Sequence, residues 1–183
     1  GLQKEANRKL GLTAAQTLEV AQALYERHKV TTYPRTDASV LPEDYPEKVR
    51  DALQSLFDQP LGEHAKRVIQ QNWINPKNRK VFNNEKISDH FAIIPTCEKP
   101  KGLSEVEAKV FHMICQRFIA VFHPNAEFQH TTRTTIVAGE TFRASGRVMT
   151  SPGWKIVYGA GDDEDEKSPV LCALKAGELA KNL

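Results

Sequence analysis

Apolar side chains recur every three or four positions in five stretches of the chain, and this spacing is typical of amphipathic helices. The five predicted helices cover about residues 2–10, 14–28, 46–57, 63–71 and 104–122. Two of these helices follow a capping-box pattern, which is formed by Thr13 with Gln16 and by Ser104 with Glu107. Gly11 would end the first helix. The first two thirds of the chain are therefore predicted to be mainly helical.

Residues 30–42 break this helical pattern. The segment begins with three β-branched residues, which favour extended backbone: Val30, Thr31 and Thr32. Pro34 fixes its own backbone angle and disfavours helix at Tyr33. Tyr33 is therefore predicted to lie at the end of a short extended segment, just after a helix.

The pattern changes again after His123–Pro124, where Thr, Val, Ile and Phe become frequent. Residues 126–149 are predicted to form two strands joined by a turn at Ala138–Gly139–Glu140. The acidic run at 161–167 is predicted to be a solvated linker before residues 169–183.

These elements predict an α+β protein with a helical unit at 1–123 and a strand-rich unit at 124–183. The second unit has few strands, and two or three strands without partners are only marginally stable. We therefore expect the chain to be an excised piece of a longer protein.

Composition and charge narrow the class of protein. The 183 residues are 40 % apolar and 26 % charged, as in soluble globular proteins. No apolar run approaches the roughly 18–20 residues that a membrane-spanning helix needs. The net charge of +2 makes no general case for nucleic-acid binding, so any such case depends on where the charges lie. Cys97, Cys115 and Cys172 lack paired spacing, which argues against a zinc site or a disulfide framework and indicates a reducing compartment.

Tyr33, Arg35 and Asp37 form the first candidate site. A phenol is mostly protonated at neutral pH, so it needs help to act as a nucleophile. A nearby guanidinium favours the phenolate and holds a phosphate through two parallel hydrogen bonds. Residues two apart in extended backbone share a face, so Tyr33 and Arg35 would address one phosphate while Asp37 orients the arginine. The alternative is a partly buried packing tyrosine beside a surface ion pair.

His90 is the second candidate, in the stretch "SDHFAIIPT" (88–96). The apolar run after it can anchor the histidine. An imidazole donates to phosphate oxygens and changes charge near neutral pH. The alternative is a histidine that caps or packs.

Residues 72–90 are polar, contain Asn75–Pro76, and are predicted to be a loop. Four basic side chains in this loop are candidates for contact with a nucleic-acid backbone: Lys77, Arg79, Lys80 and Lys86. The alternative is an ordinary exposed basic loop. The sequence has no Gly-rich phosphate loop and no closely spaced metal ligands, and the acidic run is predicted to be solvated rather than metal-binding.

Taken in order, these stretches resemble the type IA DNA topoisomerases, most closely their topoisomerase III branch. "LQKEANRKLGLTAAQTLEVAQALYE" is similar to the segment before that family's active site. "TTYPRTDASVLP" matches the active-site motif, and "SDHFAIIPT" matches the later histidine motif. "FRASGRVMTSPGWKIVY" and the acidic linker before "PVLCALKAGE" resemble the family's segments beyond the histidine motif. The resemblance covers nearly the whole chain.

The resemblance implies a specific reaction. Tyr33 would attack a phosphodiester of single-stranded DNA, leaving a 5′-phosphotyrosyl link and a free 3′-hydroxyl. A second strand would pass through the gap before the hydroxyl reverses the attack, without ATP. Arg35 would hold the phosphate, and His90 would bind the scissile phosphate or its neighbour. Thr36 and Asp37 would support them.

The resemblance also implies a fold. Residues 1–123 would form the active-site tyrosine domain, which has helices and a small sheet like those of winged-helix or catabolite-activator proteins. Residues 124–183 would form a strand-rich part of the gate arch. Two positions depart from the family pattern: Ala38 stands where many members carry Ser or Cys, and Phe91 stands where many have a second histidine.

The implied cofactor is Mg²⁺, whose ligands would precede this chain, so that no metal site is expected within it. The implied partners are single-stranded DNA and the missing acidic metal-binding domain, with no membrane. The implied location is the bacterial cytoplasm, at the nucleoid. The chain alone is expected to be inactive.

Other classes remain open. One is a non-catalytic winged-helix-like DNA-binding module in which Tyr33 stacks on a base. A tyrosine recombinase or relaxase is disfavoured, because "HFAI" lacks the arginine expected after the histidine and no His-x-His pair occurs. A simple interaction domain leaves the Tyr-Pro-Arg order unexplained.

Overall fold

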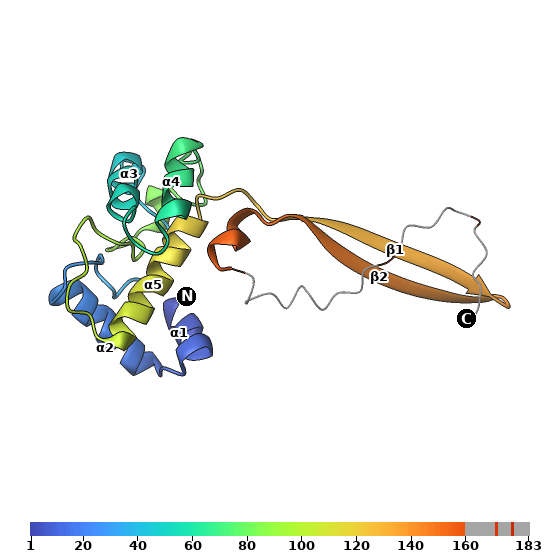
Figure 1. Cartoon of the computed structure of the whole chain (residues 1–183), viewed down its shortest axis with the longest axis horizontal. Coiled ribbons are helices and arrows are strands. Elements are labelled where there is room, and N and C mark those ends of the chain that lie inside the picture. Colours follow the sequence, from blue (N-terminus) through green and yellow to red (C-terminus); the bar gives the residue numbers. More distant parts are fainter. Residues whose placement is uncertain (160–170, 172–176, 178–183) are drawn as a thin grey trace. The chain divides into compact units, whose positions relative to one another are not determined.

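The computed structural model describes residues 1–159, Leu171 and Gly177. The chain divides into two compact units, Gly1–His123 and Pro124–Leu183, and each is described by itself (Figure 1). The acidic run and nearly all of the segment after it lie outside the described residues.

The five predicted helices all form in the first unit. They are α1 (Leu2–Leu10), α2 (Ala14–Glu26), α3 (Pro46–Ser55), α4 (Gly62–Gln70) and α5 (Glu105–Ala120). The prediction for α2 is two residues too long, because Lys29 takes a left-handed φ of 58° and turns the chain away from the helix axis. None of the helices formed by the described residues is both long and apolar enough to cross a membrane.

The predicted helix caps form at Gly11, Thr13 and Ser104. Both capping boxes are present, at Thr13 before α2 and at Ser104 before α5. Gly11 follows α1 with a left-handed φ of 68°, and its N–H donates to the Asn7 carbonyl. Each cap therefore satisfies backbone groups that the helix itself leaves unpaired.

The core of the first unit lies around α5. This helix packs against α2 and α4, while α1 packs on α2 and α3 on α4 (Figure 1). The core includes side chains from these helices and from the extended segments: Leu24, Val30, Leu53, Val68, Phe82, Val110 and Ile119.

The extended segments of the first unit do not form regular strands. Among the described residues of this unit, β-type pairing is limited to two isolated bridges, Thr31 with Pro95 and Leu41 with Phe82. The small sheet implied by the resemblance is therefore reduced to single rungs. Proline lacks the N–H that a ladder needs, so Pro34 prevents the first pairing from continuing beyond Thr32.

The second unit contains the predicted hairpin. β1 (Glu127–Val137) pairs antiparallel with β2 (Glu140–Ser151), and a 3₁₀ turn, η2 (Gly153–Val157), comes after them. Ala138 and Gly139 connect the strands, with φ angles of 51° and 84°. Positive φ at both central residues is the geometry of a type I′ turn, whose twist matches that of the strands.

Glu107 ties the start of α5 to the end of α2. It is buried, accepts from the Ser104 backbone N–H at 2.8 Å, and forms an ion pair with Arg27. His28 Nε2 lies 3.4 Å from Oε2, which accepts the Ser104 bond, whereas Arg27 pairs with Oε1. The Ser104 backbone hydrogen bond, helped by Arg27 and His28 and opposed by burial, lowers the pKa of Glu107 from 4.5 to about 2.

We predict that Glu107→Gln destabilises the first unit at neutral pH. Glutamine preserves the capping box and removes the charge. The variant therefore isolates the contribution of the charge to the free energy of unfolding. Because folding lowers the pKa of Glu107, the charged carboxylate stabilises the fold above pH 4.5, and this stabilisation is lost as the pH falls towards 2. Arg27 is largely exposed, so solvent weakens the pair, and we expect a loss of about 2 kcal/mol.

Urea unfolding at pH 7 and at about pH 2 measures the difference between the two proteins. Glu105→Gln is the matched control, since Glu105 also lies in the first turn of α5 but pairs with Lys109 on the surface. A gap between wild type and Glu107→Gln that is equal at both pH values would contradict the electrostatic explanation.

Candidate active site

Tyr33 lies just beyond the bridge between Thr31 and Pro95. Its half-buried ring contacts two other aromatic rings. The Tyr25 ring on α2 meets it edge to face, with ring centroids 5.4 Å apart. The His90 ring lies across it at 4.2 Å with an interplanar angle of 43°. The structure therefore brings the two motifs that the sequence singled out into direct contact.

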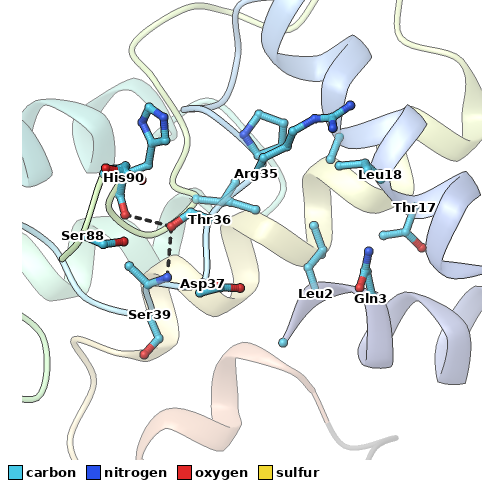
Figure 2. A pocket seen from close by; sticks show the side chains of 16 residues that line it. Leu2, Gln3, Thr17, Leu18, Arg35, Thr36, Asp37, Ser39, Ser88 and His90 are labelled. Atoms are coloured by element: carbon cyan, nitrogen blue, oxygen red, sulfur yellow. Dashed lines mark hydrogen bonds between the residues drawn. The ribbon is translucent and has the colours of Figure 1, made fainter. Parts of the chain in front are cut away.

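Arg35 reaches α2 rather than Asp37. Its Nη2 donates to Gln22 Oε1 at 3.0 Å, and Gln22 Nε2 donates to Glu26 Oε1 at 2.8 Å. In Figure 2 the Arg35 side chain extends towards α2, while Asp37 points in another direction.

The prediction that Asp37 orients Arg35 is therefore wrong, since the backbone after Pro34 is not a regular strand and the two-residue alternation is lost. Gln22 and Tyr25 are three residues apart on one face of α2. Through these two contacts, Arg35 and Tyr33 meet the same face of that helix.

Thr36 connects the tyrosine motif to the histidine motif. Its hydroxyl donates to the His90 carbonyl at 2.8 Å and accepts from the Ala38 N–H at 3.0 Å (Figure 2). The His90 side chain itself is exposed. The backbone of His90 is thus held by a hydrogen bond, while its imidazole is open to solvent on the side away from Tyr33.

A cavity of about 700 Å³ lies beside these residues (Figure 2). Segments 34–39 and 88–90 line it together with residues from α1 and α2. Its polar side chains include Arg35, Asp37, Ser39, Ser88 and His90. Its volume lies within the range of about 300–1,000 Å³ that small-molecule sites occupy.

A metal site is not evident in the described part of the chain. Among those residues, no three His, Cys, Asp or Glu side chains are grouped so that they could hold a metal ion. The described residues therefore offer no donor set for Mg²⁺, whose ligands the resemblance places outside this chain.

Arg79 contacts a neighbouring loop. It forms an ion pair with Glu43, whose carboxylate also accepts from the Asn84 N–H at 3.2 Å. The Asn84 hydrogen bond and Arg79 lower the pKa of Glu43. The other three basic candidates, Lys77, Lys80 and Lys86, are exposed and form no salt bridge with any residue the structure describes. Arg79 therefore joins two loops, whereas the lysines face solvent.

The sequence pattern did not single out Gln22 or Tyr25 of α2 as site residues. Their spacing, together with Glu26 one residue further on, was a usable signal, since positions i, i+3 and i+4 lie on one face of a helix. Nothing in the sequence indicated that this face would meet Arg35.

Comparisons with known proteins identify the family of this chain. The DNA topoisomerase family model matches residues 1–182. The chain is 40 % identical to DNA topoisomerase 3 of Bacillus licheniformis and 37 % identical to that of Bacillus subtilis. Each match covers 97 % of this chain and 25 % of the relative, so the chain spans about a quarter of the length of these curated relatives.

A solved structure shares the fold. It is full-length topoisomerase I from Thermotoga maritima, with 23 % identity and a TM-score of 0.63 over 97 % of this chain and 28 % of that one. At this identity the likeness concerns the fold alone. The family model and the relatives' identity go further: the chain belongs to the type IA DNA topoisomerase family, in its topoisomerase III branch.

Proposed function

We propose that, in the whole protein, Tyr33 cleaves single-stranded DNA by transesterification. The proposal rests on the contact between the Tyr33 and His90 rings. Arg35 lies nearby and bonds the same face of α2 that Tyr33 contacts. The phenol oxygen forms a bond to phosphorus as the bond from phosphorus to the 3′-oxygen breaks. The phenol loses a proton and the departing 3′-oxygen gains one. The enzyme then holds a 5′-phosphotyrosyl link, which conserves the energy for resealing after strand passage.

Each neighbouring residue has a role in this reaction. Arg35 exchanges its hydrogen bond to Gln22 for the phosphate and stabilises the charge that develops there. His90 donates to the scissile phosphate or its neighbour from its exposed imidazole. Thr36 supports His90 through the carbonyl hydrogen bond, and Asp37 lines the adjacent cavity.

Each of the two units of the chain has a part in the whole protein under this proposal. Residues 1–123 act as the active-site tyrosine domain, of winged-helix type, and residues 124–183 belong to the gate arch. Mg²⁺ supplies charge stabilisation in the family and is held by residues outside this chain, so no step described here passes through it. We expect the chain alone to be inactive. We also propose a cytoplasmic, nucleoid-associated location, as for a DNA enzyme of a bacterium; the relatives are bacterial DNA topoisomerases.

We predict that Tyr33→Phe abolishes covalent cleavage, because the ring remains but the nucleophilic oxygen is gone. The chain is combined with the remaining segments of a type IA topoisomerase, Mg²⁺ and single-stranded DNA labelled at its 3′ end. That label stays on the fragment carrying the 5′ link. The readout is a protein–DNA adduct that survives denaturation.

Tyr45→Phe is the matched control, since Tyr45 packs on Phe91 and should retain the adduct. A DNA-binding module in which Tyr33 only stacks on a base would form no adduct with the wild type. Such an absence, or an adduct that persists in Tyr33→Phe, would refute the proposed nucleophile.

We predict that Arg35→Lys slows adduct formation about 100-fold at saturating DNA. Lysine keeps the charge but lacks the planar fork that bonds a phosphate twice, and losing one such donor typically costs about 10²–10³-fold. Single-turnover rates measure the effect. Arg50→Lys, on the surface of α3, is expected to leave the rate unchanged. Equal rates for Arg35→Lys and wild type would remove Arg35 from the reaction.

We also propose that the basic loop holds the DNA backbone through its exposed lysines. Replacing Lys77, Lys80 and Lys86 together by Ala should reduce the slope of log affinity against log salt by about 2, since each contact to a single strand contributes about 0.7. Fluorescence anisotropy with the whole protein at several salt concentrations gives this slope. Lys99→Ala, which removes a surface ion pair with Asp58, is the control. An unchanged slope in the triple variant would exclude the loop from binding.

A further inference from the structure

Thr32 lies at the point where the pairing between residues 30–32 and 94–96 ends. Its N–H donates to the Ile94 carbonyl at 3.0 Å, and Thr96 N–H donates to the Val30 carbonyl at 3.0 Å. In a regular antiparallel ladder, paired residues exchange both of their hydrogen bonds. Ile94 N–H would then bond the Thr32 carbonyl, and an N–H at position 34 would bond the Ala92 carbonyl.

Neither of these two bonds forms between backbone groups. Position 34 is proline, which has no N–H, so the Ala92 carbonyl has no ladder donor there. The Thr32 hydroxyl takes both places instead. It donates to the Ala92 carbonyl at 3.2 Å and accepts from the Ile94 N–H at 2.9 Å. One side chain therefore completes the pairing while the backbone turns away at Tyr33.

These bonds hold the backbone of the segment that follows His90. The imidazole is exposed, and its ring lies 4.2 Å from the Tyr33 ring between centroids. Its position over Tyr33 therefore depends on the backbone of segment 90–94. Thr36 holds one end of that segment at the His90 carbonyl, and Thr32 holds the other end at Ala92 and Ile94.

We propose that Thr32 is a positioning residue for strand cleavage, whose hydroxyl sets the contact between Tyr33 and His90. This inference rests on the proposed function of Tyr33. A displacement of about 1 Å in a reacting group can slow a reaction about 100-fold, so a side chain that fixes this contact affects the rate rather than the binding of DNA.

The neighbouring residue offers a matched control. Thr31 is 2 % exposed, and its hydroxyl has no hydrogen-bond partner among the described residues. Replacing Thr31 by Val makes the same chemical change as Thr32→Val, one position away. Removing an unbonded buried hydroxyl costs nothing in hydrogen bonding, whereas Thr32→Val leaves the Ile94 N–H and the Ala92 carbonyl without their partner.

The first experiment measures adduct formation in the reconstituted topoisomerase at saturating single-stranded DNA, together with DNA affinity. We expect Thr32→Val to slow the reaction by about 10- to 100-fold while the dissociation constant changes by less than about 2-fold. Thr32→Ser keeps the hydroxyl and should stay within about 3-fold of wild type, since serine can make the same two bonds. Thr31→Val should match wild type.

The second experiment uses NMR of the chain itself and does not depend on catalysis. Thr32→Val should speed hydrogen exchange of the Ile94 amide and change the ring-current shifts of Tyr33 and His90, whereas Thr32→Ser and Thr31→Val should not. The spectrum also shows whether each variant is folded.

The outcomes separate the two proposals. If wild type forms no adduct, the proposed function fails, and NMR still decides whether Thr32 sets the ring contact. If Thr32→Val disturbs Ile94 and the rings but reacts at the wild-type rate, the positioning role is overturned while Tyr33 keeps its function. Equal slowing by Thr31→Val and Thr32→Val would also overturn it, since both would then act through packing.

Discussion

The short pairing between residues 30–32 and 94–96 is the constraint on which the candidate site depends. It joins parts of the chain that are 62 residues apart at Thr32 and Ile94. A single hydrogen-bonded rung would be weak alone, but here it is buried beside Val30 and Pro95 and reinforced by side-chain hydroxyls. Tyr33 emerges directly from this pairing, so its contact with His90 depends on where the pairing stops.

The helices place further side chains next to this local pairing. Glu107 fixes the start of α5 to the end of α2 by one buried carboxylate that caps one helix and pairs with Arg27 beyond the other. The extended segment follows α2 directly, and the Val30 N–H donates to the Leu24 carbonyl at 3.0 Å. The face of α2 that carries Gln22 and Tyr25 then meets Arg35 and Tyr33. α2 therefore packs against α5 and also contacts the candidate site.

The positions of the charged residues in this protein matter more than its net charge. The net charge is +2, yet Arg35 and His90 both line one cavity, and three lysines of the loop at 72–90 face solvent. Arg79, by contrast, pairs with Glu43 and joins two loops. Basic residues adjacent in sequence thus differ in what they can do, since one is neutralised by a partner and the others remain available to a polyanion.

The sequence by itself determined the elements that depend on local interactions. Helical periodicity, the capping boxes at Thr13 and Ser104 and the turn at Gly139 act within a few residues, so they can be read directly along the chain. The tertiary structure alone decided the bond from Arg35 to Gln22 and the double role of the Thr32 hydroxyl. Irregular backbone has no period from which to infer side-chain direction, and these partners are far apart in sequence. They become neighbours only when the core closes around α5.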